Sequence, residues 1–444
     1  MKRIYQDFAY GDGPVAECYW DTTVARPPRQ PAPEGDVEAE IAIIGGGYTG
    51  LSAALHLSRD AGADVAVLEA NGIGWGASGR NGGFATMGGT KADDATLHRR
   101  FGAKAMVEWY AAQRAACALV AEVIDRYRIE VDAHSHEGEM CLAHRMREFN
   151  GFRSEAEALS KAYGVKVDVL SRADLIAEGM AGPEFHGGLR LPVGFALNPL
   201  KYVLGLADAA RASGARIYEN APVISVTHES GRYVLTTPTG RVRARKLILG
   251  TNGYSSDDIP AWMAGRYMPA LSAILVTRQL TAGEIAAQGW SSGVLAYDTR
   301  SLLHYFRLMP NGRFLFGGRG GTSSSAAALN DRRTILRADF ERMFPAWAHV
   351  ETPYYWSGFV CLARSLTPYV GPLGNQGDAW AGFAWHGNGV ALATYAGQLL
   401  ARLATGQGGV PALLTPTPAR FPFGSARRNL LRPAYAWYGI KDLG

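Results

Sequence analysis

The chain has 444 residues, of which 47% are hydrophobic and 19% charged. It can therefore bury a sizeable core and is neither a disordered nor a fibrous protein. The 45 Lys and Arg against 40 Asp and Glu give a formal charge of +5, and the basic residues are scattered apart from a thin cluster at 427–432, which argues against a nucleic-acid partner. Four widely spaced cysteines without a CxxC pair argue against a disulfide framework and a metal site.

The first residues lack the features of a targeting segment. Residues 1–20 carry acids and glycines without the continuous apolar run of a secretory signal. No stretch of the sequence reaches the roughly 20 apolar residues that a membrane helix needs. Residues 26–38 are rich in proline and polar residues, so we interpret 1–38 as an N-terminal arm. We expect a cytoplasmic monomer or homodimer with no integral membrane segment.

The next segment has the pattern of one βαβ unit. A short apolar run at 39–44 is followed by a glycine-rich turn, an apolar helix from Leu51 to Ser58, a second strand at 64–68 and then Glu69. Glycine is unusually frequent in the chain, at 54 residues, or about 12% against an average near 7%. The turn is one of the places where it clusters.

The turn reads Gly45-x-Gly47-x-x-Gly50. Gly45 would make the tight turn, Gly47 would let the backbone approach a pyrophosphate, and Gly50 would allow close packing of helix on strand. The helix N-terminus favours phosphate, and Glu69 stands where an acid accepts hydrogen bonds from a ribose. The segment predicts dinucleotide binding; the alternative is a structural turn.

A second glycine-dense loop follows directly at 72–84. Such a loop is not a feature of nicotinamide-binding units and suits a longer ligand, such as the ribityl and isoalloxazine parts of FAD. Ser78 and Arg80 could reach phosphate or ribityl oxygens. The alternative for Arg80 is a solvated loop charge.

The rest of the chain predicts a mixed architecture. Helical spacing dominates about 94–127 and 199–214, whereas short strands recur at 215–249 and alternation with turns at 267–318. The predicted class is α/β (α+β), with a Rossmann-like domain around a central parallel sheet and a substrate domain with an antiparallel sheet, both discontinuous in sequence. The expected FAD-binding domain comprises 39–90, 160–260 and 355–444, and the expected substrate-binding domain comprises 91–159 and 261–354.

A hairpin at 302–318 is the predicted substrate wall. Asn311-Gly312 favours a two-residue loop, which would place Arg307 opposite Phe316 and Tyr305 opposite Gly318. Tyr305 and Arg307 share one face of the sheet by period two. We expect this face to cover the flavin, with either side chain holding a substrate carboxylate or amide. The alternative for Arg307 is a structural ion pair.

A glycine-rich loop also precedes the C-terminal helix. His386-Gly387-Asn388-Gly389 leads into a helical segment at 390–403. A helix N-terminus aimed at the flavin pyrimidine would favour the negative charge that collects there on reduction. The alternative is an ordinary surface helix.

Several strings together resemble one known family. GGGYTGLSAALHL with GIGWGASGRNGG, LILGTNGY at 247–254, YFR with NGRFLFGG at 305–318, and GFAWHGNGV at 382–390 resemble the FAD oxidoreductases of the D-amino-acid oxidase superfamily, and most closely the gamma-glutamylputrescine oxidase branch. These strings run in family order from Ala39 to Leu400. Many relatives carry histidine where this chain has Asn388.

The resemblance implies an FAD enzyme that oxidises a carbon–nitrogen bond. Hydride would pass from the substrate carbon to flavin, leaving an imine that water hydrolyses. Cys361 lies near the point where some relatives attach FAD, but its spacing matches poorly, so non-covalent binding is expected. The implied cofactor contacts are Gly45, Gly47, Tyr48, Thr49, Gly50, Glu69, Ala77, Ser78, Arg80, Asn81, Gly82, Gly83, Val223, Thr251, Asn252, Gly387, Asn388, Gly389 and Val390.

The electron acceptor and the substrate stay open at this point. Several relatives use a lysine beside the flavin to activate dioxygen, but this chain has no lysine between Lys246 and Lys441. His304 or an arginine could substitute, or a quinone or carrier could replace dioxygen. The substrate would be a small amine or amino-acid-like molecule. Alternative functions are a partner-dependent, non-catalytic flavin subunit and a tRNA-modifying amine oxidase.

Overall fold

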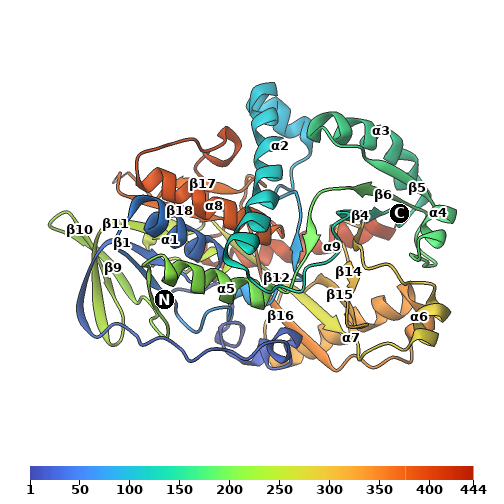
Figure 1. The fold of residues 1–444 in the computed structure, drawn as a ribbon, viewed down its shortest axis with the longest axis horizontal. Helices are drawn as coiled ribbons and strands as arrows, with labels where there is room; N and C mark the ends of the chain where they lie inside the picture. Colours follow the sequence, from blue (N-terminus) through green and yellow to red (C-terminus); the bar gives the residue numbers. More distant parts are fainter. Residues whose placement is uncertain (376, 444) are drawn as a thin grey trace.

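One sheet of the protein is built around parallel strands (left side of Figure 1). The computed structural model describes residues 1–375 and 377–443. The strand order is β17 (Tyr369–Pro372), β18 (Ala379–Phe383), β11 (Gly240–Leu249), β1 (Gly35–Ile44), β2 (Val65–Leu68) and β8 (Arg216–Tyr218). Strands β18, β11, β1, β2 and β8 pair in parallel, while β17 and the hairpin of β9 (Ser225–Glu229) and β10 (Arg232–Thr236) pair antiparallel.

Three helices cover this sheet. Helix α1 (Tyr48–Ala61) contacts both α5 (Pro199–Ala212) and α8 (Gly389–Ala404). The approach of α8 to α1 is very close, because a Cβ at Gly397 would lie 2.6 Å from the carbonyl oxygen of Thr49. The carboxyl ends of β1, β2 and β11 consequently open beside the N-termini of α1 and α8, which is where open parallel sheets bind ligands.

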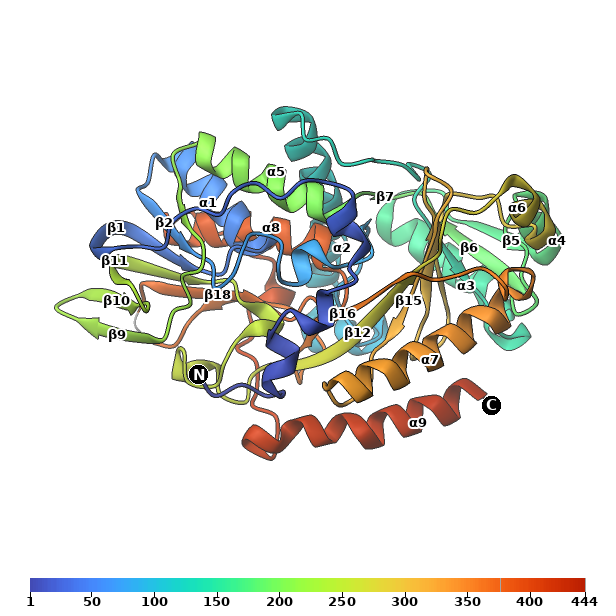
Figure 2. The same ribbon diagram turned by 90° about the horizontal axis from the view of Figure 1, so that it is seen from below.

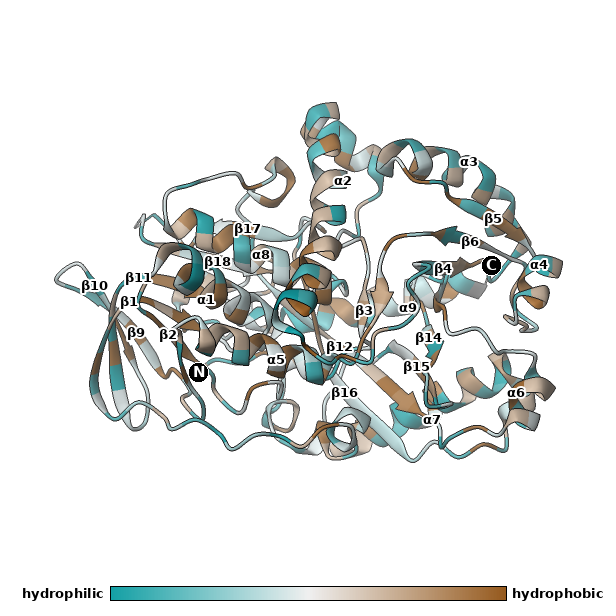
Figure 3. Cartoon of the chain, viewed as in Figure 1, coloured by the Kyte–Doolittle hydropathy of each residue, from teal (hydrophilic) through white to brown (hydrophobic). Residues whose placement is uncertain are grey.

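The second sheet is antiparallel apart from one pair. Its order is β16 (Tyr354–Leu362), β12 (Met268–Val276), β15 (Phe314–Arg319), β14 (Tyr305–Leu308), β13 (Leu295–Asp298), β4 (Glu139–Leu142), β6 (Gly187–Leu191) and β5 (Asp168–Ser171), with β13 and β4 parallel. One face packs an aromatic core, including Phe306, Phe314 and Phe316, against α7 (Ala326–Met343) and the segment that follows it. In Figure 3 hydrophobic residues gather along strands such as β12, whereas the exposed side of α3 is hydrophilic.

The remaining elements connect and flank the sheets. Helix α2 (Asp94–Tyr127), which bends at Gly102 where φ is +79°, stands between the two sheets (Figure 1). In Figure 2, α9 (Leu431–Leu443) runs below α7, and its Asp442 accepts hydrogen bonds from the amides of residues 301 and 302. The other helices and strands are α3 (Met146–Tyr163), α4 (Arg172–Ala177), α6 (Ala282–Gln288), β3 (Phe84–Ala85) and β7 (Phe195–Ala196); short 3-10 helices span Asp7–Tyr10, Gly13–Val15, Tyr19–Thr22, Ala77–Gly79, Asn252–Tyr254, Ala261–Met263, Pro345–Trp347, Ala412–Leu414 and Gly424–Leu430.

The predicted fold class is confirmed: a parallel sheet with helices accompanies a separate antiparallel sheet. The predicted division of the chain differs in detail. Strands β5 and β6 lie within 160–260, and β16 begins at the predicted boundary, yet all three pair within the antiparallel sheet. The sequence of a short strand does not indicate which of the two sheets the strand joins. Among the described residues, no helix combines the length and apolar character required to cross a bilayer.

Candidate active site

The glycine turn after β1 forms the end of a first cavity of about 200 Å³. Gly45 has φ +105°, which favours glycine. A Cβ at Gly47 would lie 2.9 Å from Ser78 Oγ, and a Cβ at Gly50 only 1.9 Å from the carbonyl oxygen of Gly45. The turn is therefore closed to side chains, so its backbone N–H groups and the N-terminus of α1 can approach a phosphate.

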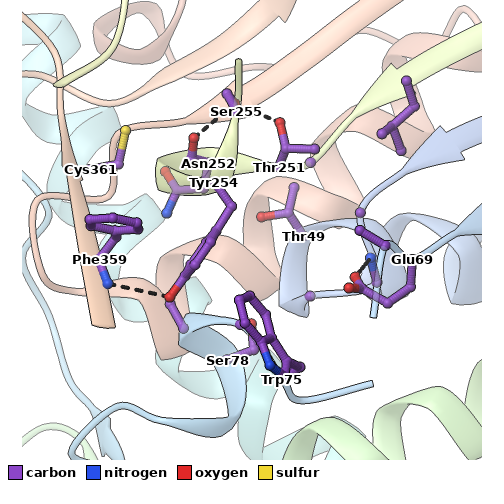
Figure 4. Close-up of a pocket in the computed structure, with 18 of the residues that line it drawn as sticks. Thr49, Glu69, Trp75, Ser78, Thr251, Asn252, Tyr254, Ser255, Phe359 and Cys361 are labelled. Atoms are coloured by element: carbon purple, nitrogen blue, oxygen red, sulfur yellow. Dashed lines mark hydrogen bonds between the residues drawn. The ribbon is translucent and has the colours of Figure 1, made fainter. Parts of the chain in front are cut away.

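Acid and hydroxyl groups are arranged around this turn (Figure 4). Glu69 accepts hydrogen bonds from the backbone N–H of Gly46 (2.8 Å) and of Asn71 (3.0 Å), and burial raises its pKa. Ser78 Oγ accepts from the backbone N–H of Tyr48 at 3.0 Å, at the first turn of α1. The carboxylate faces the cavity from the end of β2, in the place expected for a group that binds a ribose.

The third strand end completes this cavity. Thr251 Oγ1 lies 2.6 Å from Ser255 Oγ, and the Asn252 side chain accepts from the amide of Ala384 (2.9 Å), which ties the end of β11 to the segment after β18. Tyr254 stacks edge-on against Trp75 across the cavity, as Figure 4 shows. Residues from three neighbouring strand ends therefore face one space.

Arg80 is buried, which corrects the alternative of a solvated loop charge. It is 4% exposed, and its guanidinium carbon lies 4.1 Å from the Trp75 ring centroid. The guanidinium donates one hydrogen bond, from Nη1 to the carbonyl oxygen of Ser357 at 3.4 Å. No described residue accepts a hydrogen bond from Nε or Nη2. A buried cation with spare donors fits an anionic or carbonyl-rich ligand such as FAD.

A second cavity, of about 290 Å³, adjoins the first. The two share residues from three segments, so together they form one elongated space. One wall of the second cavity is a single face of the antiparallel sheet, and the other is formed by the segments 77–91 and 386–390. The shared residues are Ala77, Asn81, Phe359, Val360, Gly387 and Gly389.

Most of the expected cofactor residues line these cavities. The first cavity holds Gly45, Gly47, Tyr48, Thr49, Glu69, Ala77, Ser78, Asn81, Val223, Thr251, Asn252, Gly387 and Gly389; the second adds Arg80, Gly82, Asn388 and Val390. Gly50 and Gly83 line neither. They are sites of close backbone approach, since a Cβ at Gly83 would lie 2.0 Å from the carbonyl oxygen of Leu197.

The N-terminus of α8 meets the junction of the cavities. Gly389 begins the helix, and Asn388 makes no side-chain cap; its amide nitrogen instead donates to the carbonyl of Met87. The first-turn N–H groups of this helix are left for a ligand. His386 behind it stays neutral, since burial lowers its pKa to about 4, and Nε2 accepts from the amide of Ala363.

The pairing register of the hairpin differs by one residue from the predicted register. Tyr305 pairs with Gly317 and Arg307 with Leu315, and residues 309–313 form a longer loop. The amide of Met309 donates to Arg313 and that of Gly312 to Met309, so Asn311-Gly312 sits inside the loop rather than forming it alone. Gly317 is nevertheless required, because a Cβ there would lie 2.2 Å from the Tyr305 ring.

Tyr305 does face the second cavity, whereas Arg307 and His304 do not. The Tyr305 hydroxyl lies 3.0 Å from Ser272 Oγ, also on the cavity wall. Arg307 instead donates to the carbonyls of Leu197 (2.9 Å) and Gly83 (3.5 Å) and lies near Trp20. Its expected position at the substrate is thus corrected: the guanidinium holds the β3 and β7 segments together.

His304 points to the opposite face of the sheet. Its Nδ1 lies 2.8 Å from Asp298 and its Nε2 3.3 Å from Asp339 of α7. Burial opposes the imidazolium, but the two carboxylates outweigh it and raise the pKa of His304. The expectation that His304 could replace a flavin-side lysine is therefore corrected, because alternation along β14 turns residue 304 away from the cavity.

Replacement of Tyr305 and of Arg307 should separate these two roles. We expect Arg307→Ala to lower the free energy of unfolding by about 2–4 kcal/mol, since it opens a void and strips the Leu197 carbonyl of its donor. Tyr305→Phe should change it by less than about 1 kcal/mol, because only a cavity-facing hydroxyl is lost. Thermal unfolding measures both, and equal effects would contradict the assignment.

The sequence analysis missed three charged residues of the second cavity. Lys91, Arg319 and Glu139 come from the loop after β3, the end of β15 and the start of β4. The chain has no lysine between Lys246 and Lys441, but Lys91, from much earlier in the sequence, lines this wall. An acid opening the otherwise apolar strand Glu139-Met140-Cys141-Leu142 was the sequence signal for Glu139.

Comparisons with known proteins agree with this geometry. Residues 40–403 match the model of the family described as FAD dependent oxidoreductase (DAO). A probable oxidoreductase OrdL from Rhizobium meliloti is 32% identical over 97% of this chain and 98% of its own, and the gamma-glutamylputrescine oxidoreductase of Escherichia coli is 31% identical over 83% and 84%.

Solved structures share the fold at lower identity. Glycine oxidase from Geobacillus kaustophilus superposes with a TM-score of 0.69 at 19% identity, covering 85% of this chain and 97% of that one. Iminodiacetate oxidase from Chelativorans sp. BNC1 gives 0.70 at 20% identity, covering 86% and 100%. With the family match spanning most of the chain, the protein belongs to the DAO family of FAD-dependent oxidoreductases and is an enzyme of the amine and amino-acid oxidase type.

Proposed function

We propose that the protein oxidises a C–N bond of a gamma-glutamylputrescine-type or other N-substituted amine, giving an imine that hydrolyses to an aldehyde or keto product. The observation that carries the proposal is the second cavity. It continues the dinucleotide cavity, is walled by the antiparallel sheet, and is lined by a carboxyl group, by cations and by Tyr305. The similarity to gamma-glutamylputrescine oxidoreductase supports the choice of amine class.

The residues of this chain would hold the cofactor and shape the site. FAD, when bound, supplies the hydride acceptor. The glycine turn and the N-terminus of α1 would bind its pyrophosphate, Glu69 a ribose and Arg80 an anionic or carbonyl group. The N-terminus of α8 would favour negative charge near Gly387 and Gly389. The sheet face carrying Tyr305 and Trp356 would exclude water from the reacting carbon.

We propose that FAD is held without a covalent bond. Cys361 lines the first cavity and is a free, buried thiol. Burial raises its pKa to about 12, so the thiolate that would attack the flavin is scarce at neutral pH. Denaturation of the yellow protein followed by ultrafiltration should release all the flavin into the filtrate; flavin retained with the chain would contradict non-covalent binding.

The decisive experiment is anaerobic reduction by amines. The purified holoenzyme is mixed without oxygen with a panel of gamma-glutamylputrescine, N-methyl amino acids, small secondary amines and D-amino acids. We expect loss of the flavin absorption near 450 nm with at least one amine, and a rate that rises with pH as the reacting amine loses its proton. A flavin that no amine bleaches would favour the partner-dependent subunit instead.

We propose dioxygen as the acceptor, with a quinone or a carrier as the alternative. Lys91 supplies a cation at the cavity wall, where negative charge transferred to dioxygen would be stabilised. Mixing the anaerobically reduced enzyme with air distinguishes the two, since an oxidase regains its colour rapidly and a dehydrogenase does so slowly.

A further inference from the structure

Besides Arg80, three charged groups line the second cavity without a partner of opposite charge among the described residues. Glu139 is 6% exposed, and among the described residues Thr86 is the side chain that donates a hydrogen bond to its carboxyl group. Neither Lys91 nor Arg319 forms an ion pair with any residue that the structure describes. Elsewhere in the protein, buried charged groups such as Asp298 and Arg427 are paired, with Arg300 and Asp257 respectively. The second cavity therefore leaves one carboxyl group and two cations available to a charged ligand.

The sheet register places the acid and the cations at opposite corners of the cavity wall. Cys141 pairs with Tyr297, Tyr297 with Tyr305 and Tyr305 with Gly317, so these residues form one row across four strands. Glu139 lies two residues before this row and Arg319 two residues beyond it, on strands that run in the same direction. At about 4.8 Å per strand and 3.3 Å per residue, their Cα atoms are roughly 19 Å apart.

The two cations share one end of this wall. Lys91 comes from the facing segment, close enough to Arg319 for the two charges to repel each other. Burial, assisted by this repulsion, lowers the pKa of Lys91 to about 8. The Lys91 side chain nevertheless remains exposed. An anion placed there would relieve the repulsion and gain charge-assisted hydrogen bonds.

Glu139, at the other end of the wall, is surrounded by neutral groups. The titratable groups around it are Cys117 of α2, Cys141 of β4, Tyr163 of α3 and Tyr297 of β13, and burial raises the pKa of each, so all are neutral near pH 7. Burial likewise raises the pKa of Glu139 to about 8. A carboxyl group surrounded by neutral groups becomes ionised when a cation enters, so this end is suited to an ammonium group.

We propose that the cavity selects an elongated substrate with charges at both ends, whose ammonium group binds Glu139 and whose carboxylate binds Lys91 and Arg319. This rests on the proposed amine oxidation and narrows its substrate to amino carboxylates, a class that includes gamma-glutamylated diamines. An amine without a carboxylate leaves two cations unpaired, and a carboxylate without an amine leaves Glu139 without its cation.

The test compares three probes of equal chain length, 6-aminohexanoate, hexylamine and hexanoate. Dissociation constants for the oxidised holoenzyme come from perturbation of the flavin absorption, read by rapid mixing without oxygen so that binding is separated from reduction. We expect 6-aminohexanoate to bind at least about ten-fold more tightly than either other probe, since each lost charge-assisted contact weakens binding by that order.

Single substitutions assign each end. In Glu139→Gln, 6-aminohexanoate should no longer bind more tightly than hexanoate but should still bind more tightly than hexylamine. In Lys91→Met or Arg319→Met, 6-aminohexanoate should lose its tighter binding relative to hexylamine and keep it relative to hexanoate. Glu157→Gln and Lys161→Met, both exposed on α3, serve as matched controls and should change neither ratio. Bound flavin shows that each variant is folded.

Failure of this inference can be told from failure of the proposed function. If amines reduce the flavin but the ratios stay the same in all three cavity variants, or hexylamine binds as tightly as 6-aminohexanoate, the two-ended cavity is wrong and amine oxidation stands. If no amine reduces the flavin although 6-aminohexanoate binds with the expected ratios, amine oxidation is wrong and the charge arrangement stands.

Discussion

Gly50→Ala should yield protein that lacks bound flavin and unfolds at a lower temperature. The Cβ would lie 1.9 Å from the carbonyl oxygen of Gly45 and 3.2 Å from Ile43. Because the first contact is backbone, relief requires α1 to move away from β1, which also displaces the N–H groups that would bind the pyrophosphate. Overpacking of this kind costs about 1–3 kcal/mol or more, and FAD occupancy, read from the 280 to 450 nm absorbance ratio, should fall more than ten-fold.

Gly151→Ala is the matched control for this substitution. Gly151 also lies within a helix, α3, but nothing lies within 4 Å of the position its Cβ would take. Alanine there should retain full flavin and raise the free energy of unfolding by about 0.5–1 kcal/mol through helix propensity. Full flavin in Gly50→Ala, or equal flavin loss in both variants, would show that close packing at Gly50 does not shape the cofactor site.

The cofactor half of the site was predictable because its signals are local in the sequence. Gly45, Gly47, Gly50 and Glu69 fall within one βαβ unit, and each has a steric or electrostatic reason for its position. The segment that carries Ser78 follows directly, so its place beside the turn could also be expected. Sequence periodicity likewise located α2 and α8, because amphipathic spacing and glycine ends mark a helix on its own residues.

The substrate half was not predictable at the same level, because it depends on register and on contacts between distant segments. The hairpin around Asn311-Gly312 contains a longer loop than its dipeptide suggests, and a shift of one residue changes which residue faces which. The role of Arg307 as a donor to the carbonyls of Gly83 and Leu197 depends on partners more than 100 residues away.

The positions of Glu139 and Lys91 in the cavity could not be predicted for the same reason. Neither is adjacent to a motif, and Lys91 lies more than 200 residues from Arg319 in sequence. Only the pairing of β4 with β13, and of β13 with β14, brings the acid to the cavity wall. A single acid in a buried apolar strand is the kind of local inconsistency that marks a functional position.

Glu139→Gln should make the substrate-free enzyme more stable, and increasingly so as the pH rises. Burial raises the pKa of Glu139 from its ordinary value of 4.5 to about 8. Between these values the folded protein keeps a proton that the unfolded chain releases, so the free energy of unfolding of the native enzyme falls as pH rises and the full loss is reached above pH 8. Glutamine has the same shape and does not titrate.

The difference between Glu139→Gln and the native protein should therefore be small at pH 4.5 and reach about 5 kcal/mol at pH 9, at 1.36 kcal/mol for each unit of pKa difference. Unfolding temperatures measured at pH 5, 7 and 9 give this trend directly, and the exposed Glu157→Gln should show no pH-dependent difference. A Glu139→Gln difference that is constant with pH would mean that the carboxyl group is already ionised in the empty cavity. In that case a cation or solvent would compensate it before any substrate binds.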